Sequence, residues 1–435
     1  MKTKTRKKDK VNIITLGCSK NMVDSEVLSG QLRASDIDVV HENYKTDHNI
    51  VIVNTCGFID KAKEESVNSI LHQVELKKRG KIDKVFVTGC LSERYKSNLE
   101  QEIPEVDAYF GTFELPRLLN RFNVDYQAEL IGERLLSTPS HYAYLKISEG
   151  CDRTCAFCAI PLMRGRHISR PIHQLVAEAA SLVKKGVKEV MLIAQELTYY
   201  GLDIYKKREL PALLHALADI EGLEWIRLHY AYPTKFPTEI LDVIRERENI
   251  CNYLDMPLQH ASDNILKAMR RQISRSEIND LIYTVREKVP GICIRTTLIS
   301  GFPGETLDDV ENIKAFLRQH RFDRVGIFAY SHEEGTGAYQ LADNISNEEK
   351  ERRAEEIMEV QQEISYEKNI EKVGNTFKVM IDKIESGRYV GRTEFDSVEV
   401  DNEVIISSPE KLIIGNFTRV KITKAYDYDL EGEVE

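Results

Sequence analysis

The spacing of apolar and polar residues changes along the chain. From Val11 to about Phe122, short apolar runs alternate with longer stretches in which apolar residues recur every three or four positions. The short runs are typical of buried β-strands, and the longer stretches are typical of amphipathic helices. Their regular alternation favours a parallel sheet. We therefore predict a small parallel α/β domain over residues 11–130, preceded by a disordered basic tail over residues 1–10.

Three of these strands deliver a cysteine at their carboxyl ends. "VNIITLGC" ends at Cys18, "NIVIVNTC" at Cys56 and "DKVFVTGC" at Cys90. Each separation suits one strand-helix unit of a parallel sheet. Ligands of open parallel sheets bind outside the carboxyl ends of the strands, so we expect these three thiols to converge. The glycine or threonine before each cysteine leaves room for a bulky inorganic group.

A second alternating series follows a linker at residues 131–141. It contains six strand-like runs separated by helical stretches, namely "YAYLKI", "EVMLIA", "WIRLHY", "NYLDM", "ICIRTTLIS" and "RVGIFAY". This pattern predicts a parallel barrel or partial (β/α) barrel over residues 142–370, whose chemistry lies on the loops that follow the strands. The charged stretch "NEEKERRAEEIMEVQQEISYEKN" predicts a helix that joins this domain to the tail.

The last part of the chain changes pattern again. From Lys372 onward, short apolar runs are broken by glycine, as in "FKVMI", "YVGRT", "EVIIS" and "FTRVKIT". This spacing predicts a small antiparallel β-barrel over residues 371–435.

Composition limits the setting of these domains. With 42% hydrophobic residues in 435, the chain can bury full cores in two or three domains. Eight cysteines are too few for a disulfide scaffold and indicate reduced thiols, so we expect a cytoplasmic protein. No apolar run reaches membrane-spanning length, and we expect no membrane partner. A net charge of -10 argues against broad attraction to nucleic acid.

The stretch "EGCDRTCAFCAIP" places Cys151, Cys155 and Cys158 at C-x-x-x-C-x-x-C spacing, with no fourth cysteine nearby. Zinc sites usually close with four protein ligands. A 4Fe–4S cluster held by three thiolates instead keeps one iron open for a substrate or cofactor. A structural zinc site and three incidental cysteines remain as alternatives. Phe157 inside the motif is either ordinary packing or an aromatic ring placed to shield a bound cofactor.

This motif resembles the signature of radical S-adenosylmethionine (SAM) enzymes. "LGCSKNMVDSE", "NTCGFID" and "TGCLSERY" resemble the N-terminal domain of methylthiotransferases, and the terminal barrel resembles a TRAM domain. The resemblance implies SAM and two 4Fe–4S clusters as cofactors. It implies that the catalytic cysteines Cys151, Cys155 and Cys158 hold the cluster that cleaves SAM to a 5′-deoxyadenosyl radical. Cys18, Cys56 and Cys90 would hold a second, sulfur-donating cluster.

Within this family, "LGCSKNMVDSE" and the tail sequence "GRTEFDSVEVDN" are closer to the ribosomal-protein aspartate branch than to the tRNA-adenosine branch. Val398 stands where the family commonly has proline. The resemblance implies attachment of a methylthio group to the β-carbon of an aspartate in the twelfth small-subunit ribosomal protein. It also implies a reducing electron donor such as flavodoxin or ferredoxin. A tRNA adenosine methylthiotransferase and a non-enzymatic iron–sulfur carrier remain as alternatives.

The charge of the tail bears on this choice. Residues 372–435 contain nine Lys or Arg against thirteen Asp or Glu, whereas a module that grips RNA should be basic. We therefore do not expect direct binding of nucleic acid. We expect the acidic barrel to dock the basic ribosomal protein through Glu394, Asp396, Glu399 and Asp401, the alternative being a merely solvated surface.

Residues after the other strands are candidate SAM contacts. "LISGFPGET" brings Gly301, Gly304 and Glu305 to the cofactor face, where glycines permit close backbone approach. Gln195 and Glu196 follow the second strand of the series and could reach the ribose or amino group of SAM.

Six further residues carry weaker expectations. Gln259 and His260 follow the fourth strand, and His260 is either a substrate-side group or a packing residue. Arg164 and Arg166 either neutralise carboxylates or are solvated. Cys251 and Cys293 are expected to be small buried thiols.

Overall fold

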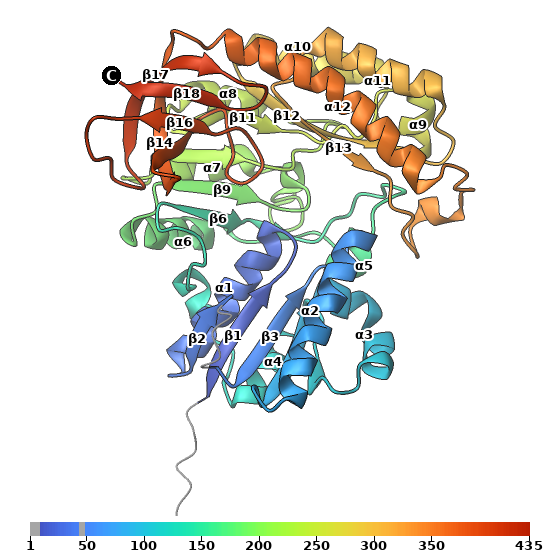
Figure 1. The fold of residues 1–435 in the computed structure, drawn as a ribbon, viewed down its shortest axis with the longest axis vertical. Helices are drawn as coiled ribbons and strands as arrows, with labels where there is room; N and C mark the ends of the chain where they lie inside the picture. Colours follow the sequence, from blue (N-terminus) through green and yellow to red (C-terminus); the bar gives the residue numbers. More distant parts are fainter. Residues whose placement is uncertain (1–8, 43–47) are drawn as a thin grey trace, which may run out of the picture. The chain divides into compact units, whose positions relative to one another are not determined.

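The computed structural model describes residues 9–42 and 48–435, which form two compact units (Figure 1). The first unit holds the described residues up to Thr138, Glu149–Asp152 and Ala159–Arg166. The second unit holds Pro139–Ser148, Arg153–Cys158 and His167–Glu435. The chain therefore passes between the units inside its C-x-x-x-C-x-x-C motif. Most of the predicted disordered tail, residues 1–8, lies outside the described residues.

The first unit is built on a five-stranded sheet in the order β2-β1-β3-β4-β5, with every pairing parallel. The strands are β1 (Lys10–Thr15), β2 (Asp38–His41), β3 (Ile50–Thr55), β4 (Lys84–Gly89) and β5 (Ala108–Tyr109). The helices are α1 (Ser19–Ala34), α2 (Asp60–Lys78), α3 (Cys90–Glu102), α4 (Leu115–Leu119) and α5 (Ile160–Arg164), with short 3-10 turns at Asn120–Phe122 and Ala128–Glu133. The predicted parallel α/β domain is confirmed.

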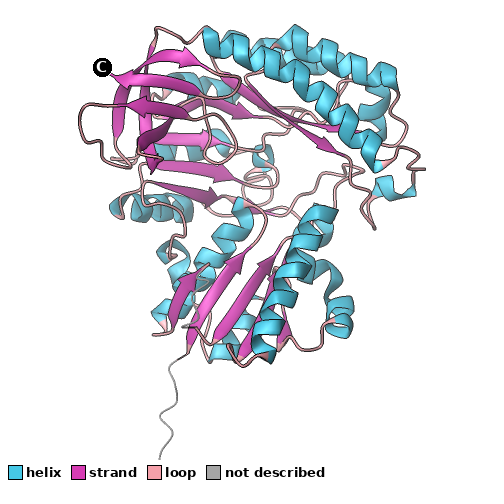
Figure 2. Cartoon of the chain, in the orientation of Figure 1, coloured by secondary structure: helices cyan, strands magenta, loops and turns pink. Residues whose placement is uncertain are grey.

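Both faces of this sheet are covered by helices, as Figure 2 shows in cyan and magenta. Ile50 and Ile52 of β3 pack on one face with apolar residues of α1 and α4. Val51 and Val53 pack on the opposite face with those of α2 and α3. A strand buried on both faces must be apolar at successive positions. This requirement explains why "IVIV" is a continuous apolar run.

The second unit contains six parallel strands in the order β13-β12-β11-β10-β9-β6. They are β6 (Tyr142–Lys146), β9 (Glu189–Ile193), β10 (Trp225–Leu228), β11 (Ile250–Asp255), β12 (Cys293–Ser300) and β13 (Arg324–Ala329). Each corresponds to one of the six predicted runs. The sheet is not closed among the described residues, so the partial barrel is confirmed.

Helices separate these strands. They are α6 (Ile172–Lys184), α7 (Leu210–Ala218), α8 (Glu239–Glu246), α9 (Asp263–Ala268), α10 (Arg275–Lys288), α11 (Leu307–His320) and the predicted charged helix α12 (Asn347–Ile370). Short 3-10 turns lie at Leu197–Tyr199 and Gly337–Gln340. A small two-stranded sheet joins β7 (Ser148–Glu149) to β8 (Ile168–Ser169). In the described part of the chain, no helix has both the length and the apolar character to cross a membrane.

The end of the chain forms a closed five-stranded barrel in the order β14-β15-β16-β18-β17, drawn in red in Figure 1. Its strands are β14 (Thr376–Glu385), β15 (Arg388–Thr393), β16 (Val404–Ser407), β17 (Phe417–Ala425) and β18 (Leu430–Val434). Four pairings are antiparallel as predicted, but β16 and β18 pair in parallel. This exception arises because β17 lies between them in sequence and returns the chain to its earlier direction.

Buried ion pairs fix this barrel to the six-stranded sheet within the second unit. Arg392 of β15 pairs with Glu189 of β9, and both side chains are buried. Asp396 pairs with Arg324 of β13, again with both side chains buried. Each ion loses its hydration on burial, so removal of one partner leaves an uncompensated charge. The barrel is therefore held against the sheet by charge pairs as well as by apolar packing.

The predicted docking role of the acidic tail segment needs correction. Asp396 is 1% exposed and bound to Arg324. Asp401 accepts hydrogen bonds from Arg295 and from the Tyr253 hydroxyl, and Glu394 accepts one from the backbone of Asn252. Three of the four carboxylates thus hold the barrel to the sheet. Only Glu399 is exposed and available to another protein.

Candidate functional site

Cys18, Cys56 and Cys90 lie at the carboxyl ends of β1, β3 and β4, which are neighbours in the first sheet. Cys56 and Cys90 are buried, whereas Cys18 is exposed. Burial is the main cause that raises the pKa of the Cys56 thiol, and the nearby charge of Cys18 raises it further. The charges of Cys18 and Cys56 also act on Cys90. The three thiols therefore converge at one edge of the sheet, as expected.

Two glycines beside these cysteines permit close packing of the strand ends. Gly17 has a φ of +92°, and an added Cβ would lie 2.8 Å from the sulfur of Cys56. Gly89 has a φ of +97°, and its added Cβ would lie 2.5 Å from the carbonyl oxygen of Thr55. Larger residues would therefore push the cysteine-bearing loops apart.

Arg164 donates a hydrogen bond from Nε to the sulfur of Cys90 over 3.2 Å. Its side chain is 2% exposed and also donates to Asp24 over 2.6 Å, to Glu149 over 3.3 Å and to the Asn21 amide oxygen. The expected neutralisation of carboxylates by Arg164 is confirmed. Arg166 pairs with Asp152, but it is 89% exposed.

The Cys90 thiol has an unusual electrostatic setting. Burial raises its pKa to about 12, while the positive charge of Arg164 acts in the opposite direction. A thiol must lose its proton before it can bind iron. A guanidinium beside Cys90 therefore favours the ionised form that a metal ligand requires.

The second set of cysteines lies in the loop between β7 and α5. In the second unit, the sulfur of Cys155 lies 3.4 Å from the Tyr232 hydroxyl and 3.4 Å from a guanidinium nitrogen of Arg271. The backbone of Ala156 is held at both ends, since its N–H donates to Met269 and its carbonyl accepts from Ala338. In the first unit, the N–H of Cys151 donates to the carbonyl of Gly165. Each part of this loop is therefore held by backbone contacts within its own unit.

Arg153, inside the motif, is held between two aromatic rings. Its guanidinium lies 3.9 Å from the ring centroids of both Tyr199 and Tyr232 and donates to Glu196 over 3.0 Å. The other oxygen of Glu196 accepts from the N–H and the hydroxyl of Thr198. Both oxygens of Glu196 thus accept hydrogen bonds from other protein groups. A contact between Glu196 and SAM stays a prediction.

Glu305 is likewise engaged inside the second unit. Its Oε1 accepts from the N–H of Gly301 over 2.9 Å and from Arg353 over 3.0 Å, and its Oε2 lies 3.2 Å from Nε2 of His260. Gly301 also packs tightly against the side chain of Lys350. These contacts shape the loop after β12, so direct binding of SAM by Gly301, Gly304 and Glu305 stays a prediction.

Phe157 and Gln195 are partly buried. Phe157 packs against a cluster formed by Ala156, Ile265, Met269, Phe302, Tyr330 and Ala338. Gln195 lies two residues after the end of β9. Their predicted contacts with SAM stay predictions. The expectation of buried thiols at Cys251 and Cys293 is confirmed, since they are 1% and 2% exposed.

Sequence reasoning missed several residues that surround the cysteines in the structure. They are Asn21, Asp24, Arg153, Tyr199, Tyr232 and Arg271. Arg153 could have been found from its place inside the cysteine motif. Tyr232 and Arg271 carry no such signal, because they lie far along the chain from Cys155 and meet it only in the folded protein.

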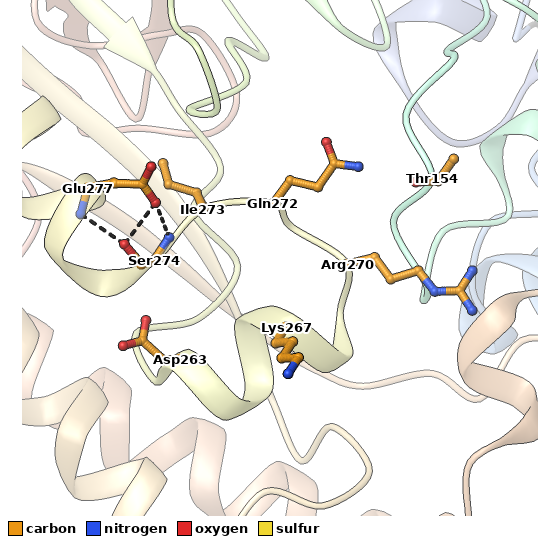
Figure 3. Close-up of a pocket in the computed structure, with 8 residues that line it drawn as sticks. All are labelled: Thr154, Asp263, Lys267, Arg270, Gln272, Ile273, Ser274 and Glu277. Atoms are coloured by element: carbon orange, nitrogen blue, oxygen red, sulfur yellow. Dashed lines mark hydrogen bonds between the residues drawn. The ribbon is translucent and has the colours of Figure 1, made fainter.

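A pocket of about 520 Å³ opens beside the cysteine loop of the second unit. It is lined by Thr154, Asp263, Lys267, Arg270, Gln272, Ile273, Ser274 and Glu277. Figure 3 shows Thr154 and Arg270 on the same side of the view, while Ser274 and Glu277 hydrogen-bond to each other. The pocket thus adjoins the loop that carries the cysteines and offers the cations Lys267 and Arg270.

The two cysteine sets supply thiolates, which are the usual protein ligands of the irons in a 4Fe–4S cluster. Among residues 9–42 and 48–435, no three His, Cys, Asp or Glu side chains are grouped closely enough for one metal ion. A 4Fe–4S cluster is wider, and its thiolates bind separate irons. Two sets of three thiols, one at a sheet edge and one in a fixed loop, fit this wider group.

Three family models match successive parts of the chain. Residues 10–111 match the Uncharacterized protein family UPF0004, residues 145–317 the Radical SAM superfamily, and residues 373–434 the TRAM domain.

Full-length relatives are similar to the whole chain. Proteins named ribosomal protein uS12 methylthiotransferase RimO are 59% identical in Flavobacterium psychrophilum and 57% identical in Cytophaga hutchinsonii, each over 100% of both chains. The protein of that name in Bacteroides thetaiotaomicron is 53% identical over 98% of this chain and 99% of its own.

Solved structures share the fold at low identity. The radical SAM methyltransferase TsrM from Kitasatospora setae, with tryptophan and a SAM analogue bound, has a TM-score of 0.55 and 15% identity over 73% of this chain and 72% of its own. The cobalamin-dependent SAM radical enzyme OxsB, with aqua-cobalamin and SAM bound, has a TM-score of 0.51 and 12% identity over 81% of this chain and 56% of its own.

Proposed function

This chain belongs to the RimO family of radical SAM methylthiotransferases, and we propose from that premise how its six cysteines divide the work of modifying an aspartate of ribosomal protein uS12. Cys151, Cys155 and Cys158 hold the cluster that binds SAM. Cys18, Cys56 and Cys90 hold the auxiliary cluster that provides the sulfur. When bound, the two 4Fe–4S clusters and SAM supply the methyl group, the sulfur and the hydrogen-abstracting radical.

One observation carries this division of roles. The thiols of Cys18, Cys56 and Cys90 converge at the carboxyl edge of the first sheet, while Cys155 and Cys158 lie in a loop of the second unit. Two separate sets of three ligands each leave one iron of a 4Fe–4S cluster open. A non-enzymatic carrier would normally close each cluster with a full set of ligands, so this arrangement favours the enzyme.

The residues around Cys155 orient the SAM-binding loop. Tyr232 and Arg271 both meet the sulfur of Cys155, and the positive charge of Arg271 offsets the charge of a thiolate. Arg153 fixes the same loop through Glu196 and the rings of Tyr199 and Tyr232. A cofactor held by such a loop keeps one orientation, which radical chemistry at a single carbon requires.

The pocket beside Thr154 is the proposed entrance for the substrate aspartate. It adjoins the cysteine loop, and Lys267 and Arg270 can attract the substrate carboxylate. The target carbon carries C–H bonds that no side-chain base can deprotonate, so these cations serve to place the aspartate.

The terminal barrel is the proposed docking module for the basic protein substrate. Its net acidity lies in carboxylates that are buried or partly buried, but Glu399, Glu410 and Glu433 are exposed and can meet basic side chains of the substrate. Such charges act mainly on encounter and orientation. The reducing partner, of the flavodoxin or ferredoxin kind, and the cytoplasmic setting belong to the same proposal.

The function is tested with purified, anaerobically reconstituted protein that is given SAM, a reductant, and either ribosomal protein uS12 or tRNA. We expect a methylthio group on one aspartate of uS12, found by mass spectrometry of its peptides, and none on tRNA. Modification of tRNA alone would assign the enzyme to the adenosine branch. Replacing Glu399, Glu410 and Glu433 with glutamine should raise KM for uS12 at low salt, and an unchanged KM would contradict docking by the barrel.

A further inference from the structure

The guanidinium of Arg164 lies beside Cys90 and is held there by hydrogen bonds from all of its nitrogens. Each of its three nitrogens has an acceptor: Nε bonds to the Cys90 sulfur, Nη1 to Asp24 and Glu149, and Nη2 to Asn21. Burial of a guanidinium is unfavourable unless opposite charges compensate it. The carboxylates of Asp24 and Glu149 supply that compensation.

The acceptor on Asn21 is itself fixed. The Asn21 amide nitrogen donates to the carbonyl of Leu16 over 2.8 Å and to that of Thr55 over 3.1 Å. These two carbonyls belong to the strand ends that precede Cys18 and Cys56. The Asn21 oxygen is therefore aimed at Arg164 by the same loops that carry the other two cysteines.

The helix that carries Arg164 packs directly on Cys90. Cys90 is the first residue of α3. It forms a buried apolar cluster with Ala159 and Met163, which lie at the start of α5 and within it, and Ile160 packs against this cluster. Residues 159–166 therefore belong to the first unit, although they continue directly from Cys158. Residues 159–166, which follow Cys158 in the chain, thus pack around Cys90 of the other cysteine set.

We propose that Arg164 is a positioning residue of the auxiliary cluster, which holds the Cys90 thiolate by its Nε–H and raises the reduction potential of that cluster. This inference rests on the proposed assignment of Cys18, Cys56 and Cys90 as ligands. A hydrogen bond and a positive charge at a ligand sulfur stabilise the cluster more when it has gained an electron and is more negative. The electron comes from a chemical reductant, and one iron–sulfur cluster is reduced by one electron.

The test uses the full-length chain with Cys151, Cys155 and Cys158 replaced by alanine, so that one cluster remains after anaerobic reconstitution. Its midpoint potential is measured by dithionite titration followed by electron paramagnetic resonance. Arg164→Met should shift the potential to more negative values while bound iron stays at the parent level. Arg164→Lys retains the positive charge but not the planar guanidinium. The midpoint potential of this variant should lie between those of Arg164→Met and the parent.

Two features make these variants informative. Asp24 and Glu149 have side chains 30% and 20% exposed, so water can solvate them when the guanidinium is removed. Arg166→Met is the matched control, because Arg166 is 89% exposed and pairs with Asp152. The cluster of this variant should have the midpoint potential of the parent.

The outcomes separate this inference from the proposal on which it rests. A parent protein that binds no iron would refute the assignment of Cys18, Cys56 and Cys90, and the role of Arg164 with it. An iron-loaded Arg164→Met variant with the parent potential would refute the role of Arg164 alone. Loss of iron from both Arg164 variants, with circular dichroism unchanged, would show that Arg164 is needed to assemble the site and would likewise refute tuning of its potential.

Discussion

The hydroxyl of Tyr253 in β11 donates a hydrogen bond of 2.7 Å to Asp401 of the terminal barrel. The same carboxylate pairs with Arg295 of β12 over 3.2 Å. Asp401 is thus a buried link between the barrel and the sheet, although its charge alone would suggest a surface role.

We predict that Asp401→Asn lowers the free energy of unfolding by about 2–3 kcal/mol, because a buried hydrogen bond to a charged group and one partner of Arg295 are lost. Urea denaturation of the protein measures this change. Glu399→Gln is the control, since Glu399 is exposed and its replacement should change stability by less than about 0.5 kcal/mol. Equal effects of the two substitutions would contradict the structural role of Asp401.

Stability should also depend on pH through His320. Burial, followed by the charges of Arg286 and Arg275, lowers the pKa of His320 to about 4, and its Nε2 lies 2.8 Å from the Asn279 amide oxygen. The ordinary pKa of histidine, 6.5, applies to the unfolded chain. Between pH 6.5 and about pH 4, His320 therefore binds a proton in the unfolded chain but not in the folded protein. Stability is therefore complete above pH 6.5 and falls as the pH is lowered to 4, by up to about 3 kcal/mol.

The check is a series of urea denaturations between pH 7 and pH 4 on the parent and on His320→Gln. We expect the variant to be less stable at pH 7 but to lose less stability on acidification. Parallel pH profiles for the two proteins would rule out His320 as the titrating group.

The two cysteine sets should be separable by iron content. Reconstituted parent protein should hold about eight irons, and replacement of Cys151, Cys155 and Cys158 by alanine should leave about four and abolish SAM cleavage. Replacement of Cys18, Cys56 and Cys90 should also leave about four irons but retain reductive cleavage of SAM without methylthio transfer. Transfer at the parent rate by the second variant would contradict its assigned role.

Arg153→Lys should weaken SAM binding by roughly tenfold, or about 1.4 kcal/mol, because lysine cannot stack its charge between two rings while donating to Glu196 from a planar fork. Equilibrium dialysis with SAM measures this change at equal iron loading. Arg166→Lys, at an exposed position of the same segment, should bind SAM as the parent does. An Arg153→Lys protein with parent affinity would show that the loop is held by its other contacts.

Local patterns in the sequence determined where the strands and helices form and showed that three cysteines follow strands. Continuous apolar runs such as "IVIV" predict strands buried on both faces, and Cys18, Cys56 and Cys90 follow such runs directly. Parallel strands bring their carboxyl ends to one edge, so convergence of the three thiols follows from strand direction alone. These features need only near neighbours in the chain, which a sequence displays.

The tertiary structure alone decided which charged groups neutralise one another. The charge of the tail suggested that Asp396 and Asp401 face a partner, yet Arg324 and Tyr253 bind them inside the protein. Tyr253 and Asp401 are 148 residues apart, and Arg164 lies 74 residues from Cys90. The sign of a charge is local, but the cost of burying it is met by whichever opposite charge the fold brings within a few ångströms, and that distance is set by the packing of whole elements.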